Sequence, residues 1–170
     1  SWPEKKVVRK PKLIKPSYSD IDRHNNPVNI SAESAYREEN ENTNYFFTNL
    51  VANMSLPAGE AIEIISNSGS LNTGTQIMEL GGEIVITSET GFLLRSTEAT
   101  FLIAEKIARG QNGVNGIAPF GNFSANSFNT DVEQEIIILD GNVRINFDPN
   151  KPLNIFNSDA ATTVEGNTNW

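Results

Sequence analysis

The chain has 170 residues, of which 38% are hydrophobic and 20% charged, which suffices for one domain with a core but not for two of ordinary size. The net charge is −8 although the N-terminal segment is basic, so the remainder is strongly acidic and a nucleic-acid partner is disfavoured. Cysteine is absent, which excludes a disulfide scaffold and a thiolate metal site.

Residues 1–17 carry Pro3, Pro11 and Pro16 among basic residues. This composition is typical of an extended, poorly ordered arm rather than a packed element. Such an arm can serve as a spacer from a membrane anchor, can bind anionic lipid head groups, or can be a solvated tail without a partner. No stretch has the roughly 18 to 20 apolar residues that cross a bilayer. Because the chain begins with Ser1, we expect an anchor or leader to have been lost upstream.

A repeat of about 30 residues begins after Asn26. Its signature is an apolar residue, a small or polar residue two positions later, and usually Ala or Gly three positions after that. The copies are Ile30–Ala35, Ile64–Gly69 and Leu94–Ala99, with looser copies at Phe123–Phe128 and Ile155–Ala160. The copies start 34, 30, 29 and 32 residues apart, a near-constant spacing that predicts stacked units of two strands and two turns.

Three segments alternate apolar and polar residues in the manner of half-buried strands: Leu50–Leu56, Leu80–Ile86 and Leu139–Phe147. In the last segment the polar face consists of Asp140, Asn142, Arg144 and Asn146. The inward positions are expected to be Leu139, Gly141, Val143, Ile145 and Phe147, and in the second segment Leu80, Gly82, Ile84 and Ile86. Ala52 takes the glycine position in the first segment.

Two stretches fit this pattern less well, Ser34–Asn42 and Ala99–Arg109. The second has the composition of a short helix, but the position of Phe101–Lys106 in the repeat favours strands. The glycine-rich run at 110–116 is interpreted as a bend between strands, because no helix follows it to form a phosphate site.

Residues suited to catalysis or metal binding are sparse. His24 is the single histidine, in a loop-like segment without an evident catalytic partner. The acidic cluster of Glu38, Glu39 and Glu41 lacks the spacing of a calcium loop. Glu133 and Glu135 are interpreted as charges on a strand edge. We therefore expect no enzymatic activity, no cofactor and no metal.

The inward apolar residues of successive units should face the same space between two sheet walls. If that space is filled by these side chains, it is an ordinary core. If it opens, its continuous apolar surface suits acyl chains. The candidate lipid-contacting residues are Ile30, Leu50, Met54, Ile64, Leu80, Ile84, Ile86, Leu94, Val143 and Ile145.

The segment Val114–Gly121, the following Phe123–Ala125 and above all Leu139–Ile145 resemble the LptC family over about Tyr18 to Pro149. This family is the inner-membrane-anchored, periplasmic component of the lipopolysaccharide export bridge of Gram-negative bacteria. The resemblance implies an all-β fold, an open β-jellyroll that carries acyl chains in its interior. It also implies a membrane helix upstream of Ser1. We assign residues 18–156 to this single domain, and the polar residues 157–170, which the resemblance does not cover, to a C-terminal tail.

The resemblance also implies two docking edges. Cargo from the ABC transporter complex is expected at an N-terminal edge near Pro27–Ala35, and the next bridge protein at a C-terminal edge within Ile136–Phe147. The expected docking residues are Leu139, Gly141, Val143 and Arg144. Two alternatives stay open: a soluble, filament-forming bridge protein of the same system (LptA-like), and a β-helical carbohydrate-binding or carbohydrate-active protein.

Overall fold

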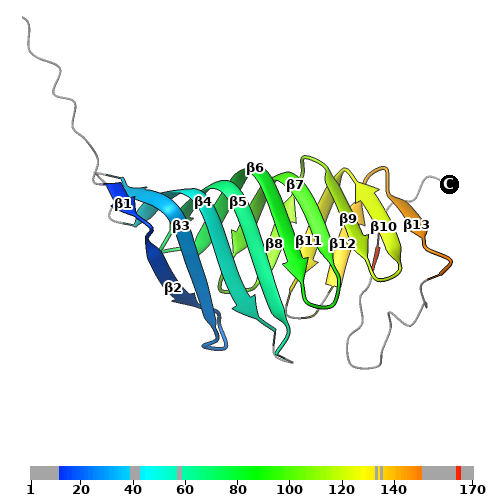
Figure 1. Cartoon of the computed structure of the whole chain (residues 1–170), viewed down its shortest axis with the longest axis horizontal. Coiled ribbons are helices and arrows are strands. Elements are labelled where there is room, and N and C mark those ends of the chain that lie inside the picture. Colours follow the sequence, from blue (N-terminus) through cyan, green and yellow to red (C-terminus); the bar gives the residue numbers. More distant parts are fainter. Residues whose placement is uncertain are drawn as a thin grey trace, which may run out of the picture.

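The computed structural model describes residues 12–38, 43–56, 59–132, 134 and 136–150, and the backbone of 164–165. These residues form strands and turns, without a helix, as the alternating pattern predicts (Figure 1). Several predicted features lie outside the described residues: the copy of the repeat at Ile155–Ala160, the tail at 157–170 apart from Val164–Glu165, the first eleven residues of the arm, Glu39, Glu41, Glu133 and Glu135. Val164–Glu165, assigned to the tail, form a short strand.

The strands follow one another along the chain with short turns between them. Their bounds are β1 (Lys12–Ile14), β2 (Ser17–Ile21), β3 (Pro27–Arg37), β4 (Asn44–Ser55), β5 (Ala61–Asn72), β6 (Ile77–Ser88), β7 (Leu93–Leu102), β8 (Ile107–Gly110), β9 (Val114–Ala118), β10 (Gly121–Ala125), β11 (Ser127–Asp131), β12 (Ile136–Asp140), β13 (Arg144–Phe147) and β14 (Val164–Glu165). Pairing is antiparallel except between β12 and β14.

One sheet folds over into two walls, because β3 to β7 are long strands that each pass from one wall to the other at a bend. The first wall has the order β2, β3, β4, β5, β6, β7, β9, β10, β13. The second has the order β1, β3, β4, β5, β6, β7, β8, β11, β12, β14. The bends line the upper margin of Figure 1, and the hairpin turns of the walls meet along the lower margin without strand pairing. We call the bends corners and the lower margin the seam. The all-β, open jellyroll is confirmed.

The repeat signature marks the corners. Its third residue is Ser66 in β5 and Ser96 in β7, and both side chains are buried. Ser66 Oγ donates to the carbonyls of Ser68 (2.7 Å) and Gly81 (3.1 Å). Such a hydroxyl satisfies backbone groups that the bend removes from the ladder, which explains the small polar residue at this point of these two units.

Glycine allows other corners to form, and here the expected strand faces need correction. Gly82 has a φ of +87° at an irregularity between β6 and β7, and it is exposed rather than inward. Gly141 has a φ of +77° and follows β12, so Leu139–Phe147 is two strands in different walls instead of one. Left-handed backbone interrupts a strand, and the sequence pattern alone did not reveal it. Phe147 is 56% exposed, not inward.

The register within each strand is otherwise as expected. Val143 is buried and Arg144 exposed, and Leu80 and Ile84 are buried. Residues 99–109 form the end of β7, a turn and β8, which confirms strands over a helix. Within the glycine-rich run at 110–116, residues 111–113 form the predicted bend, between the end of β8 and the start of β9.

The N-terminal region differs from expectation. Lys12–Ile14 and Ser17, assigned to the arm, lie in β1 and β2, which pair with β3 from either wall. Pro27–Ala35 is therefore paired on both sides and is not an edge. Strands can pair through their backbones without apolar side chains. The basic, proline-containing composition of this region therefore did not predict these two short strands.

Candidate functional site

The inner face of the first wall carries one continuous row of mostly apolar residues across nine strands. Each member is the register partner of the next, from β2 to β13: Tyr18, Ile30, Ala52, Ile64, Ile86, Leu94, Gly116, Phe123 and Ile145. The strand period separates this row sharply from the outer face. Ile64 is 1% exposed, whereas its neighbour Ile65 is 43% exposed.

The second wall faces this row with its own apolar side chains. Its inner face places Ala35, Phe47, Gly69, Leu80 and Ala99 in one register row across β3 to β7. A Cβ on Gly69 would meet Leu50 and Leu80 at 3.2 Å, so the small residue there makes room for two large ones. The two rows together bound a single apolar interior.

All ten predicted lipid-contacting residues lie on these inner faces. Eight are buried, and Ile86 and Ile145 are partly buried against the same core. The interior is thus packed by its own side chains in this structure. A ligand can enter this interior only if the walls move apart, which would break the contacts along the seam.

The predicted C-terminal docking edge, Ile136–Phe147, is divided between the two walls, and among the described strands only its β13 part has an unpaired side. In the first wall β13 pairs with β10 alone among the described strands. In the second wall β12 is flanked by β11 and β14. Of the predicted docking residues, Arg144 lies on β13 and is exposed, Leu139 is buried in β12, and Gly141 and Val143 form the corner between the two strands.

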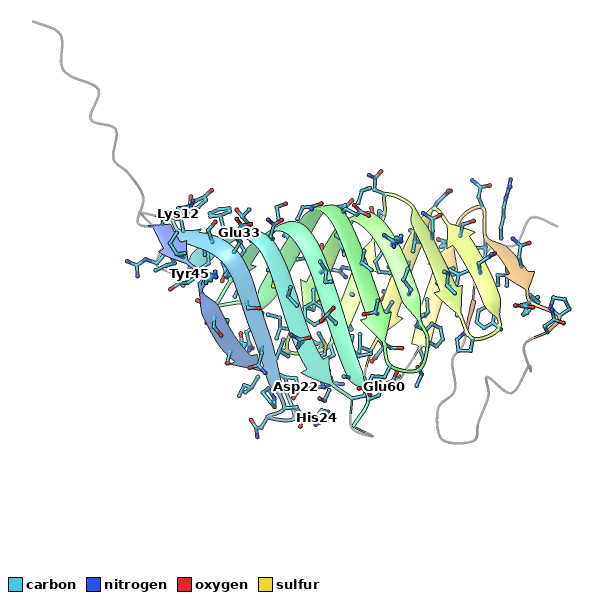
Figure 2. All side chains as sticks on the ribbon, in the orientation of Figure 1. Lys12, Asp22, His24, Glu33, Tyr45 and Glu60 are labelled. Atoms are coloured by element: carbon cyan, nitrogen blue, oxygen red, sulfur yellow. The ribbon has the colours of Figure 1, made fainter. Side chains whose placement is uncertain are left out.

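A buried ion pair, which the sequence analysis missed, joins the walls across the seam. Asp22 lies in the β2–β3 turn of the first wall and Lys106 in the β7–β8 turn of the second. Lys106 Nζ is 2.7 Å from Asp22 Oδ2, and both side chains are 1% exposed. Figure 2 places Asp22 and His24 at the lower margin, near Glu60, and Glu33 near the upper margin.

Further hydrogen bonds surround this ion pair. Lys106 Nζ also donates to the Ser55 carbonyl at 2.9 Å. Asp22 Oδ1 accepts from the backbone N–H groups of His24 (2.8 Å) and Asn26 (2.9 Å). The sequence of Asp22–Asn26 is typical of a solvent-exposed turn, and a lysine in a turn is normally exposed. The sequence around Asp22 or Lys106 therefore did not predict that either side chain is buried.

Electrostatics keep Asp22 ionised. Burial raises the pKa of its carboxyl, but the Lys106 ammonium and the N–H groups of Asn26 and His24 outweigh that effect and bring the pKa down to about 2. At the N-terminal end, burial and the neighbouring Asp20 raise the pKa of Tyr18 above its ordinary value.

The described residues contain no group of three or more His, Cys, Asp or Glu side chains arranged to hold a metal. None of them belongs to a helix with the length and hydrophobicity that a membrane crossing requires. The site is therefore best described as an apolar interior, a seam with a polar contact, and two strand edges.

Comparison with known proteins agrees with this geometry. No curated protein gave a significant match to the chain. The family model LptC, described as "Lipopolysaccharide-assembly, LptC-related", matches residues 15–148. This span runs from just before β2 to just after β13 and so includes the inner rows of both walls and the corners between the walls. The chain therefore belongs to the LptC family, whose role is in lipopolysaccharide transport assembly.

Proposed function

We propose that this chain carries lipopolysaccharide between its two walls and bridges two partners. It would accept lipopolysaccharide extracted from the inner membrane by the ABC transporter complex and pass it to the next periplasmic bridge protein. The observation that carries this proposal is the unbroken inner row from Tyr18 in β2 to Ile145 in β13. Membership of the LptC family supports the same system.

The row is long enough for a lipid. Nine strands at a spacing of about 4.8 Å extend over roughly 38 Å. Transfer of each methylene from water to such a surface contributes about 0.8 kcal/mol, so several acyl chains compensate for parting the walls. Apolar contacts do not depend on precise geometry, as hydrogen bonds do. The same interior can therefore both bind an acyl chain and release it.

The two ends suit hand-over by strand addition. The N-terminal edges are β1 and β2, where Leu13 and Ile14 are exposed, and we assign the transporter complex to this end. The edge at β13 is assigned to the next bridge protein. We place the domain at the periplasmic face of the inner membrane, held by an N-terminal helix in the full-length protein.

The proposal includes neither catalysis nor a cofactor. The family match favours the anchored component over a soluble, filament-forming bridge protein. A β-helical carbohydrate-active protein has parallel strands, whereas the described strand pairs other than β12–β14 are antiparallel.

Site-specific photo-crosslinking tests the carrier function. A photoreactive amino acid replaces Ile86, which is partly buried on the inner face, or Val85, its partly buried neighbour on the outer face. The chain is then irradiated with lipopolysaccharide in the presence of the transporter complex and ATP. We expect crosslinks from position 86 and few from position 85. Equal labelling at both positions, or none at 86, contradicts an internal route.

A further inference from the structure

Several turns contribute polar contacts to the part of the seam that contains the Asp22–Lys106 ion pair. Arg23 N donates to the Ala104 carbonyl at 2.9 Å, from the first wall to the second. Gln76 Nε2 donates to Asp20 Oδ1 at 2.5 Å and to the Ile21 carbonyl at 3.0 Å. Together with Asp22 and Lys106, these contacts join the ends of β2 and β4 to the β5–β6 and β7–β8 turns.

The two turns of the second wall are repeats of each other. Gln76 and Lys106 are 30 residues apart and are each the last residue before a strand, β6 or β8. Both adopt left-handed backbone, with φ of +56° and +54°. Non-glycine residues rarely adopt this conformation, because their Cβ comes too close to the backbone, so a packing or functional reason is expected. The common result is that both side chains reach the segment 20–22 of the opposite wall.

A buried ion pair is an inefficient way to stabilise a fold. Removing both charges from water offsets most of their attraction, and well-packed apolar residues usually do as well or better. An ion pair has a different advantage at a contact that must open. When the walls part, the two charges regain their hydration, whereas an apolar contact would expose its surface to water.

We propose that Asp22 and Lys106 form a latch across the seam, which holds the walls closed when the interior is empty and separates when acyl chains enter. The proposal rests on the carrier function above. The closed state is the one described here, with the interior filled by its own side chains. Lipid binds the open state alone, so the latch sets how much of the population can load.

A covalent lock tests this directly. Cysteines replace Arg23 and Ala104, whose backbones are in hydrogen-bond contact across the seam. Lipopolysaccharide in detergent micelles is added to the oxidised or reduced chain, and loading is measured by crosslinking from position 86. Reduced protein should load like the parent. Oxidised protein should load roughly tenfold less or worse, because the link removes the open state.

A second disulfide controls for oxidation itself. Ser19 and Asn29 are exposed register partners on β2 and β3 within the first wall, so Ser19→Cys with Asn29→Cys forms a crosslink that does not span the seam. Its oxidised form should load normally. If the seam-locked protein loads as well as its reduced form, the latch is overturned. If the parent itself acquires no lipid at position 86, the carrier function is overturned and the latch with it.

A neutral variant keeps the proposal testable if the lock perturbs folding. Asp22→Asn with Lys106→Gln removes both charges, keeps hydrogen-bonding groups, and places at 106 the residue already present at Gln76. Because a weaker contact opens more often, loading should be about threefold to tenfold faster, with the same final lipid contact at position 86. An unchanged loading rate overturns the assignment of the latch to this pair.

Discussion

Ser66 and Ser96 make equivalent hydrogen bonds at the corners of β5 and β7, which lie on either side of β6. Ser96 Oγ donates to the Glu98 and Gly113 carbonyls at 3.1 and 2.7 Å, as Ser66 Oγ donates to those of Ser68 and Gly81. They lie in one register row, separated by Ile84. In other copies of the signature the same position is alanine, at Ala32 and Ala125, so the backbone tolerates loss of the hydroxyl there.

Ser66→Ala and Ser96→Ala should each lower the free energy of unfolding by about 0.5–1.5 kcal/mol, because the backbone carbonyls of the corner lose the hydroxyl that donates to them. Ser31→Ala is the control, since that side chain is exposed on β3. Urea denaturation of the single and double variants measures the effect. The double variant should lose about the sum of the two, because the residues lie on strands that β6 separates. A loss no larger than that of the Ser31 control would exclude this role.

Gly141→Ala should destabilise the domain more than Gly113→Ala. Both glycines have positive φ, +77° and +83°, so both substitutions strain the backbone. A Cβ on Gly141 would also meet Asn126 atoms at 2.7–3.1 Å, whereas Gly113 has nothing within 4 Å. We expect an extra loss of roughly 1–3 kcal/mol at 141, measured by chemical denaturation. Equal losses would mean that Asn126 moves aside freely.

Stability should fall in acid through Asp22. Its pKa is about 2 in the folded chain against 3.8 for an ordinary aspartate, so the unfolded chain takes up the proton first. The stabilisation is complete above about pH 4 and is lost as pH falls from about 4 to 2. Asp22→Asn should be less stable than the parent at pH 7, by roughly 3–5 kcal/mol because Lys106 stays buried without a counter-charge.

Denaturant midpoints at pH 7, 4 and 2 check this behaviour, because the difference in stability between the parent and Asp22→Asn should shrink by about 2 kcal/mol as pH falls to 2. Parallel curves over the whole range would show that Asp22 is not the group responsible. A latch of this kind stays closed at neutral pH, so cargo rather than protonation opens it.

Phe147→Pro should block docking at the C-terminal edge. Asp148 N donates to the Phe120 carbonyl of the neighbouring strand connection, so by antiparallel alternation the N–H of Phe147 points away from β10. Proline removes that outward donor and keeps the pairing to β10, whereas Phe147→Ala removes only the ring. Co-purification with the next bridge protein should be lost in the proline variant and largely retained in the alanine variant. Equal behaviour of the two would count against strand pairing at this edge.

The repeat and the alternating pattern predicted most of this fold, because strand period and core burial are local consequences of sequence. Ile64 and Ile65 illustrate this, one buried and one exposed. The inward positions of Val143 and Ile145 were also correct, although Gly141, two residues before Val143, lies at a corner. A glycine in a strand pattern fits either a flat strand or a bend, and only the pairing partners distinguish them.

The seam could not be predicted because it depends on contacts between residues far apart in sequence. Asp22 and Lys106 are 84 residues apart, and each has an ordinary neighbourhood for an exposed charge. The repeat did hold a usable hint, since it aligns Lys106 with Gln76. The N-terminal strands β1 and β2 were missed because backbone pairing to β3, rather than side-chain burial, holds them.

Methyl NMR tests most directly whether acyl chains lie between the walls. Isoleucine δ1 methyls are labelled in an otherwise deuterated chain, which is loaded with protonated lipopolysaccharide, and intermolecular NOEs to acyl methylenes are recorded. Ile64 and Ile84 are buried on the inner faces, and Ile65 and Ile117 are 43% and 49% exposed on the outer face of the first wall. The carrier account predicts NOEs to Ile64 and Ile84 and none to Ile65 or Ile117. NOEs confined to Ile65 and Ile117, with the inner methyls unchanged by lipopolysaccharide, would contradict it.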